Sequence, residues 1–365
     1  MTKLDEAGPA RRLWGVGASM LMVALAGCGD PAKKDDDDKP KPPPVQALSI
    51  VAGSATETGS ADGTGAAARF KDPTGITIDA AGNLYVVDRG NHTIRRITPG
   101  GVVTTLAGSA SANAGFADGT GAGARFTDPV AIAIHPGNGT LYVTDQLRIR
   151  SVNPGTGQVG TAATVPIGTN VDDRSLNAVY PGAIALDPSG NVYTTNSYGT
   201  RHQSPTVGSG GLFEGVFTQN DLFGPRPFEP RGIAYAPQSG VWVYDLGKTI
   251  SKTNNVNLLT RVAGSPNITG SSDGTGMAAS FGQVVALTVD PQQNAYAADN
   301  GNNLVRKITQ QGVVTTVAGT RGSQALTPGA LPGSLAGVRG IATDGKGVLY
   351  VTSGQAVVKI ILPPQ

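Results

Sequence analysis

The chain has 365 residues, of which 39% are hydrophobic and 15% are charged, and its 28 basic residues nearly balance its 26 acidic residues. This balance argues against a nucleic-acid partner, because such partners normally require a strong basic excess. The single cysteine excludes an internal disulfide. The 52 glycines and 25 prolines indicate many turns between short elements.

The amino-terminal segment has the pattern of an export signal. Basic residues at positions 3, 11 and 12 precede an apolar stretch at 13–26, which is short for a membrane span but fits a signal-peptide core. The stretch ends in Leu-Ala-Gly-Cys, which resembles a bacterial lipobox. The resemblance implies that 1–27 is a lipoprotein signal peptide and that Cys28 receives a lipid anchor. The alternative is that Cys28 is a buried, inert thiol.

Residues 28–46 are predicted to form a solvated tether. The segment is charged and then proline-rich, and it has no apolar periodicity that could join a core. Gly29 follows the cysteine, where an aspartate would favour retention at the inner membrane of enteric bacteria. We therefore expect an exported lipoprotein at the outer membrane or cell surface rather than at the inner membrane.

The remaining chain, 47–365, carries an internal repeat. Residues 75–108 read GITIDAAGNLYVVDRGNHTIRRITPGGVVTTLAG, and 286–319 repeat the same order of apolar alternation, turn residues, basic pair and Val-Thr-Thr run. The aromatic residue after each glycine-asparagine-type turn marks six units, at Tyr85, Tyr142, Tyr193, Trp242, Tyr296 and Tyr350. Their separations of 49 to 57 residues suit a four-stranded propeller blade with its connector. In the first unit, strands are predicted at 75–79, 84–88, 93–97 and 102–106.

The two ends of the repeat array predict how the ring closes. The last unit stops at 357–362, which matches the third strand of the first unit, and no fourth strand follows. Residues 48–53 resemble that missing strand as it occurs at 313–319. We therefore expect an all-β, six-bladed β-propeller whose amino-terminal strand completes the last blade, which would remove two exposed sheet edges.

The repeat motifs resemble a known family. The pattern Pro-x-Gly-Ile-x-x-Asp, then Gly-Asn-Leu-Tyr-Val-x-Asp, then Asn-His-x-Ile-Arg-Arg-Ile is similar to the NHL repeat. The resemblance is strong in units one and five, while unit two keeps 141–145 but loses the Asn-His pair. It implies a six-bladed propeller of the kind found in bacterial envelope proteins and in larger animal proteins.

The connectors between units also recur. Residues 60–70 return at 116–126 and, with changes, at 271–281. They are predicted to lie on one face of the propeller, together with the turns between second and third strands; we call this the connector face. Each connector phenylalanine is predicted to fill the space between blades. The connector aspartates, which are Asp62, Asp118 and Asp273, are predicted to cap the following short turn, with structural calcium binding as the alternative.

Basic side chains and histidines give no clear chemical site. The strand arginines Arg95, Arg150 and Arg306 are among the residues predicted to be solvated, with their stems covering the sheet, rather than to bind RNA. His92 and His135 lie in turns at opposite ends of the blades, and His202 alone is insufficient for a catalytic zinc site. We therefore expect no catalytic or metal-binding residues and no cofactor.

The third unit departs most from the repeat. After Asn196 no third or fourth NHL strand is recognisable, and a long excursion is predicted to reach the connector face. Aromatics and arginines, the usual anchors of binding surfaces, gather there. The candidate ligand-binding residues are Tyr198, Arg201, His202, Phe223, Arg226, Phe228 and Arg231. In the alternative interpretation the phenylalanines fill an irregular blade and the arginines are solvated.

These features predict a monomeric, lipid-anchored envelope protein that binds or scaffolds a protein or glycan partner and does not bind nucleic acid. The alternative function is a metal-dependent lactonase or lyase that acts at the central channel of the propeller. Both follow from fold analogy, which does not by itself establish a function.

Overall fold

The computed structural model describes residues 47–110, 114–164, 182–196, 199–203, 230–245, 248–253, 259–266 and 268–364. The predicted signal peptide, Cys28 and the tether lie outside these ranges. The described helices are 3-10 helices of three residues each, namely η2 (Gly65–Ala67), η3 (Arg89–Asn91), η4 (Gly121–Gly123) and η5 (Gly276–Ala278). No helix in the described part of the chain is long and apolar enough to cross a membrane.

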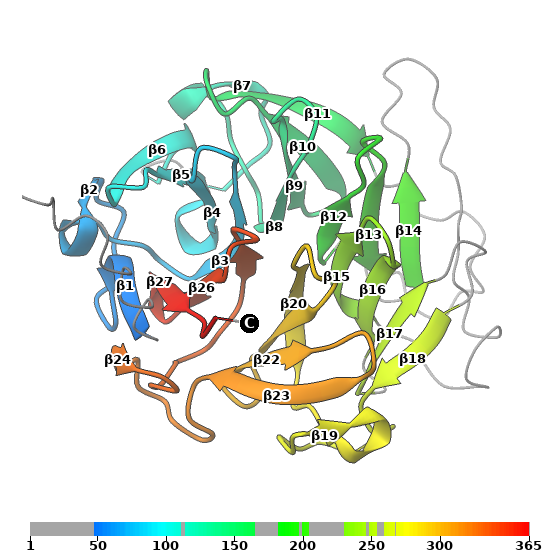
Figure 1. Ribbon diagram of the computed structural model, residues 1–365. Coiled ribbons are helices and arrows are strands. Elements are labelled where there is room, and N and C mark those ends of the chain that lie inside the picture. Colours follow the sequence, from blue (N-terminus) through cyan, green and yellow to red (C-terminus); the bar gives the residue numbers. More distant parts are fainter. Residues whose placement is uncertain are drawn as a thin grey trace, which may run out of the picture. The chain divides into compact units, whose positions relative to one another are not determined.

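The strands form antiparallel sheets around a common centre (Figure 1). The first unit has β3 (Pro73–Ile78) innermost, then β4 (Leu84–Asp88), β5 (Thr93–Ile97), β6 (Val102–Gly108) and β2 (Gly63–Thr64). The second has β8 (Pro129–Ile134), β9 (Leu141–Asp145), β10 (Arg148–Val152), β11 (Gln158–Thr164) and β7 (Gly119–Thr120). The fifth has β20 (Val284–Val289), β21 (Ala295–Asp299), β22 (Leu304–Ile308), β23 (Val313–Ala318) and β19 (Gly274–Thr275).

The other units follow the same plan with variations. The third contains β12 (Ile184–Leu186), β13 (Val192–Asn196) and β14 (Gly199–Gln203). The fourth contains β15 (Pro230–Ala236), β16 (Gly240–Asp245), β17 (Thr249–Thr253) and β18 (Leu259–Ala263). The last contains β25 (Ile341–Thr343), β26 (Val348–Ser353), β27 (Gln355–Ile361), β1 (Ala47–Ser54) and β24 (Gly329–Ala330).

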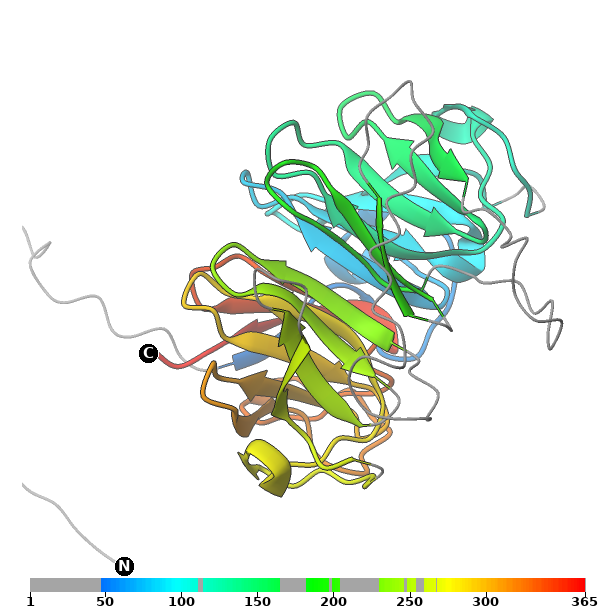
Figure 2. The same ribbon diagram turned by 90° about the vertical axis from the view of Figure 1, so that its right-hand side faces the viewer.

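The first strands of successive units contact one another around the centre. Contacts join β3 to β8, β8 to β12, β12 to β15, β15 to β20, β20 to β25 and β25 to β3. Each sheet twists outward from this inner strand (Figure 2). The fold is therefore an all-β propeller, as the repeat predicts.

The prediction of six complete blades needs correction. Five sheets have four or more strands, whereas the third unit has three strands among the described residues. Its sequence lacks the β-branched Val-Thr-Thr run that forms an outer strand in units one and five, and residues 204–229, which follow β14, lie outside the described ranges. A third strand is nevertheless present: β14 pairs with β13 directly after Asn196, so the predicted long excursion at this point is wrong. Backbone pairing does not require the NHL side chains.

The amino-terminal strand lies in the last sheet. β1 pairs antiparallel with β27 from Ala47 opposite Ile361 to Ser54 opposite Gln355, with a register shift between Ile50 and Ala52. It therefore occupies the edge of β27 that faces away from β26.

The core consists of apolar layers between neighbouring sheets. Phe126 packs with residues of the first and second units, such as Val87 and Val143. Phe281 packs in the same way with Trp242 of the fourth unit and Ala297 of the fifth. The prediction that the connector phenylalanines fill the space between blades is confirmed. Each such ring buries a large apolar area at a place where two sheets diverge.

Candidate functional site

Three sheets carry a completely buried arginine on the third strand. These residues are Arg95 on β5, Arg150 on β10 and Arg306 on β22, and each side chain is 0% exposed. The prediction that they are solvated is wrong. A guanidinium group can be buried when carboxylates and carbonyl oxygens accept its hydrogen bonds, and the propeller provides both.

One buried and one half-exposed aspartate hold each arginine. Arg95 Nη1 donates to Asp88 Oδ2 at 2.7 Å, and its Nη2 donates to Asp62 Oδ1 at 2.7 Å. Each of these nitrogens also donates to a main-chain carbonyl oxygen at 3.0 Å, and the guanidinium carbon lies 5.0 Å from the Phe70 ring centre. The equivalent sets are Arg150 with Asp145, Asp118 and Phe126, and Arg306 with Asp299, Asp273 and Phe281. We call each set an Asp–Arg–Asp cluster.

The connector aspartates do not cap the short helices, contrary to the prediction. The N-cap of η2 is Thr64, and it has no side-chain capping bond. Asp62 instead accepts hydrogen bonds from Arg95, from the Thr105 amide at 3.0 Å and from Thr105 Oγ1 at 3.0 Å. A buried guanidinium is a stronger partner for a carboxylate than a single amide is. Within the described ranges, no group of three or more His, Cys, Asp or Glu side chains is placed to hold a metal ion.

The last sheet replaces the cluster with uncharged residues. By strand register, Val358, Ser353 and Pro328 stand where Arg95, Asp88 and Asp62 stand in the first sheet. Val358 and Ser353 are both completely buried. The arginine and both of its carboxylates are thus lost together, which avoids an unpaired buried charge.

The buried aspartates also fix the chain segments that enter the inner strands. Asp88 Oδ1 accepts from the Lys71 amide at 2.8 Å, and Asp145 Oδ1 accepts from the Asp128 amide at 2.7 Å. Asp299 Oδ1 accepts from the Gln283 amide at 3.0 Å. Burial raises the pKa of all three carboxyl groups, although these hydrogen bonds and the arginines oppose the shift. The clusters therefore position residues at the inner end of the connector face.

Charged residues at this end form a chain of ion pairs. Arg89 binds Asp128 through two hydrogen bonds, from Nε at 2.6 Å and from Nη2 at 3.0 Å. Arg89 Nη1 lies 3.9 Å from Asp72, and Arg339 Nη2 lies 2.9 Å from the other oxygen of Asp72. The hydrogen bonds with Asp128 raise the pKa of Arg89 above its ordinary value. Both arginines remain partly exposed, at 37% and 42%.

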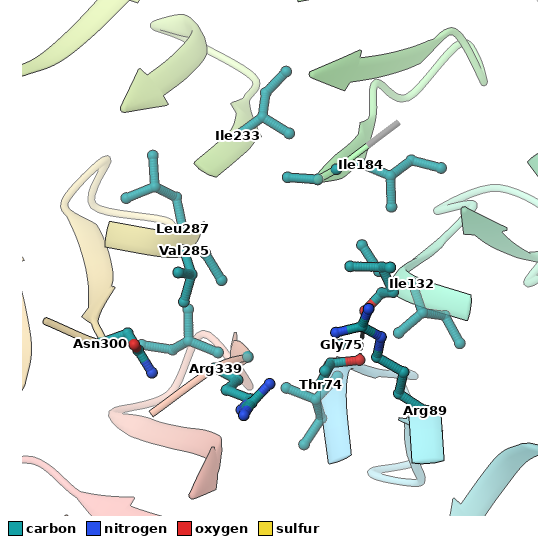
Figure 3. Close-up of a pocket in the computed structure, with 18 of the residues that line it drawn as sticks. Thr74, Gly75, Arg89, Ile132, Ile184, Ile233, Val285, Leu287, Asn300 and Arg339 are labelled. Atoms are coloured by element: carbon teal, nitrogen blue, oxygen red, sulfur yellow. Dashed lines mark hydrogen bonds between the residues drawn. The ribbon is translucent and has the colours of Figure 1, made fainter. Parts of the chain in front are cut away.

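A cavity of about 380 Å³ lies where the inner strands meet. Each sheet contributes a small residue followed by a branched aliphatic residue. These pairs are Gly75–Ile76, Ala131–Ile132, Ala183–Ile184, Gly232–Ile233, Ala286–Leu287 and Gly340–Ile341, and at least one member of each pair lines the cavity. Figure 3 shows Ile132, Ile184, Ile233 and Leu287 around the open centre. The small residue permits close approach of neighbouring strands: a Cβ on Gly340 would lie 2.2 Å from the Thr74 carbonyl oxygen.

Polar groups gather at one end of this cavity, which we call the mouth. Arg89 and Arg339 reach it from either side of Thr74, and Asn300 lies nearby (Figure 3). Gln283 also contributes to the lining. The mouth is therefore rich in N–H donors. None of the described residues that line the cavity carries a carboxylate or an imidazole.

The predicted ligand-binding residues do not belong to this described lining. Tyr198, Phe223, Arg226 and Phe228 lie outside the described residues. The backbones of Arg201 and His202 lie in β14, and that of Arg231 lies in β15, but the structure does not describe their side chains. Sequence reasoning missed the cavity, although the small–aliphatic pair at the start of each unit was a usable signal.

Comparisons with known proteins agree with the fold. Residues 70–97 match the model of the NHL repeat. A stretch of 88 residues, 24% of this chain, is 39% identical to the chloroplastic Protein SUPPRESSOR OF QUENCHING 1 of Arabidopsis thaliana. The match spans only 8% of that protein.

Solved structures resemble nearly the whole propeller at low identity. A Bacteroides thetaiotaomicron protein of unknown function superposes with a TM-score of 0.68 at 21% identity, over 87% of this chain and 76% of that chain. An auxiliary nutrient binding protein of the same species gives 0.64 at 16%, over 86% and 76%. A Xanthomonas campestris gluconolactonase gives 0.52 at 13%, over 87% and 90%. At these identities the likenesses show the fold alone.

Proposed function

The chain is a β-propeller that carries an NHL repeat, and from this premise we propose that it is a binding or scaffolding module of the bacterial cell envelope. Its partner is a protein or a glycan, held at the connector face by a monomeric propeller. The likeness to auxiliary nutrient binding proteins of Bacteroides agrees with a binding role at the level of the fold.

One observation carries this proposal. The centre of the propeller is lined by aliphatic side chains and N–H donors, which suit recognition by shape and hydrogen bonding. An acid–base catalyst would instead place titratable side chains beside the reacting atoms. The buried Asp–Arg–Asp clusters support the same role, because their aspartates fix the main-chain amides of Lys71, Asp128 and Gln283 near the mouth, and a preorganised site lowers the entropy cost of binding.

The proposal includes a lipid anchor at Cys28 and a closed six-bladed ring. Lipidation at Cys28, after removal of 1–27, would place the propeller at the outer membrane or cell surface through the tether at 28–46. The sheet of the third unit would count as the sixth blade, and β1 would close the ring. Contact between β25 and β3 supports closure.

The seven candidate residues would contribute to partner binding, namely Tyr198, Arg201, His202, Phe223, Arg226, Phe228 and Arg231. The test is crosslinking and pull-down from intact envelopes, with native protein, an Arg201→Ala/Phe228→Ala variant and a Lys346→Ala control. Lys346 is exposed in the turn between β25 and β26, at the opposite end of the blades. We expect the partner to be lost only from the double variant, and identical partner lists would remove this site.

The alternative is a metal-dependent lactonase or lyase at the central channel, since a gluconolactonase shares the fold. The two functions respond differently to chelation. A binding module retains its partner in EDTA, whereas the enzyme loses turnover of a lactone substrate. Chelator-sensitive turnover by the purified protein would favour the enzyme.

A further inference from the structure

The cavity at the centre of the propeller combines two chemical environments. Its wall carries an aliphatic residue from each of the six inner strands, and its mouth carries two guanidinium groups. Asp72 and Asp128, which pair with these arginines, are not among the residues that line the cavity. The mouth therefore presents positive groups toward the space, while their counter-charges lie outside the lining.

The arginines at the mouth have hydrogen-bonding capacity left. A guanidinium group has five N–H donors. Hydrogen bonds to Asp128 use Nε and Nη2 of Arg89, and its Nη1 approaches Asp72 only to 3.9 Å, which is too far for a hydrogen bond. Arg339 approaches Asp72 through Nη2. Nη1 of each arginine is thus available to an acceptor that enters the cavity.

We propose that the cavity binds a small amphipathic monocarboxylate. Its aliphatic chain lies between the side chains of the wall, and its carboxylate accepts hydrogen bonds from Arg89 and Arg339. Arginine suits a carboxylate because its planar N–H groups match the two oxygens. A volume of about 380 Å³ falls within the range of small-molecule sites.

The wall and the mouth disfavour other occupants. A glycan inside the cavity would place hydroxyl groups against Ile132, Ile184 and Ile233 without hydrogen-bond partners, so a glycan partner would have to bind at the connector face outside the cavity. A cationic ligand would meet two guanidinium groups. A neutral hydrocarbon would remove water from the donors at the mouth and offer them no acceptor.

This inference rests on the proposed function only in treating the channel as a binding site, and it concerns a different ligand from the envelope partner. The two can therefore fail separately. Carboxylate binding that is absent while partner capture persists overturns this inference alone. Conversely, the protein could bind the carboxylate while the Arg201→Ala/Phe228→Ala variant still captures the envelope partner. That pair of results would count against the proposed partner site alone.

The test is isothermal titration of the lipidated full chain in phospholipid nanodiscs with butanoate, hexanoate and octanoate, with empty nanodiscs as the blank. Burial of one methylene is worth about 0.8 kcal/mol, so affinity should rise about fourfold for each added methylene. Hexanamide, which has the same chain without the charge, should bind at least tenfold more weakly than hexanoate.

Two variants tie the ligand to the cavity. Arg339→Gln should weaken hexanoate about tenfold or more and hexanamide much less, because a charged acceptor gains more from a guanidinium group than a neutral one, whereas Lys346→Gln should change neither. Ile184→Trp, which fills the cavity from the wall, should abolish binding of both, with thermal melting to establish that each variant is folded. Equal affinity for hexanoate and hexanamide, affinity that does not depend on chain length, or full binding by folded Ile184→Trp would overturn the inference.

Discussion

Replacement of Asp88 by alanine should destabilise the propeller far more than replacement of Asp62, although both bind the same arginine. Asp88 is 0% exposed, whereas Asp62 is 48% exposed. Asp88→Ala leaves three donors without this acceptor: the Lys71 amide, the Asn91 side-chain amide and Arg95 Nη1. Removing one partner of a buried ion pair typically costs about 3–5 kcal/mol.

The matched variant Asp62→Ala should cost about 1 kcal/mol or less, because water screens its half of the cluster. A double variant, Asp88→Ala/Arg95→Met, removes both buried charges and keeps much of the arginine's volume. It should be less destabilised than Asp88→Ala alone, since the last sheet folds with Val358 and Ser353 at the same register.

Urea unfolding followed by the fluorescence of Trp242 measures these differences. Trp242 is completely buried, and the other tryptophan of the chain lies within 1–27. An unchanged slope of free energy against urea would mean that each variant changes stability and not the unfolded ensemble. An Asp88→Ala variant that costs no more stability than Asp62→Ala, or a double variant that is less stable than Asp88→Ala alone, would contradict this assignment of the buried charges.

Other described residues give independent tests. Burial and a hydrogen bond to Asp79 raise the pKa of Tyr85 to about 12, so the folded state keeps a proton that the unfolded chain releases from about pH 10. The stability that Tyr85 contributes below pH 10 is therefore lost as the pH rises to about 12. The free energy of unfolding of Tyr85→Phe, measured in urea, should depend less on pH between pH 10 and 12 than that of the native protein. An unchanged pH dependence would contradict this role of Tyr85. Gly340→Ala should cost about 1–3 kcal/mol in the same assay, because its Cβ would meet the Thr74 carbonyl oxygen at 2.2 Å, while Gly123→Ala, with nothing within 4 Å, should be nearly neutral. Leu48→Ala on β1 should cost about 2–5 kcal/mol of stability, because the side chain is 1% exposed. Ser49 is exposed, so Ser49→Ala should cost less than about 0.5 kcal/mol. Equal effects of the two variants would argue against β1 as a packed strand.

The strands and connectors were largely predictable because their signals are local. Alternating apolar residues and turn residues predicted strands at 84–88 and 93–97, and β4 and β5 have these bounds. The connector phenylalanines were also predictable, since large apolar rings in a repeat of short strands need a buried place. The third unit was harder, because β14 forms by backbone pairing without the side chains that marked the other strands.

The site could not be predicted in the same way. Asp62 and Arg95 lie 33 positions apart and meet because the connector returns along the outer edge of β6. From the sequence alone, Asp62 had a plausible local partner in the turn that follows it. Arg95 lies in a run of alternating apolar and charged residues, which is typical of a strand with one solvated face. A local rule failed for both because the stronger partner of each was distant in the chain.

The sequence by itself determined the repeating unit, its strands and turns, and the all-β propeller class, because these depend on patterns within a few tens of residues. Only the tertiary structure decided which charges are buried and where a binding site can form. The cavity takes its aliphatic wall from inner strands spread between Thr74 and Ile341, and no segment of the chain contains it. Its chemistry arises when the sheets meet, because their inner strands bring small, aliphatic and cationic side chains to one place.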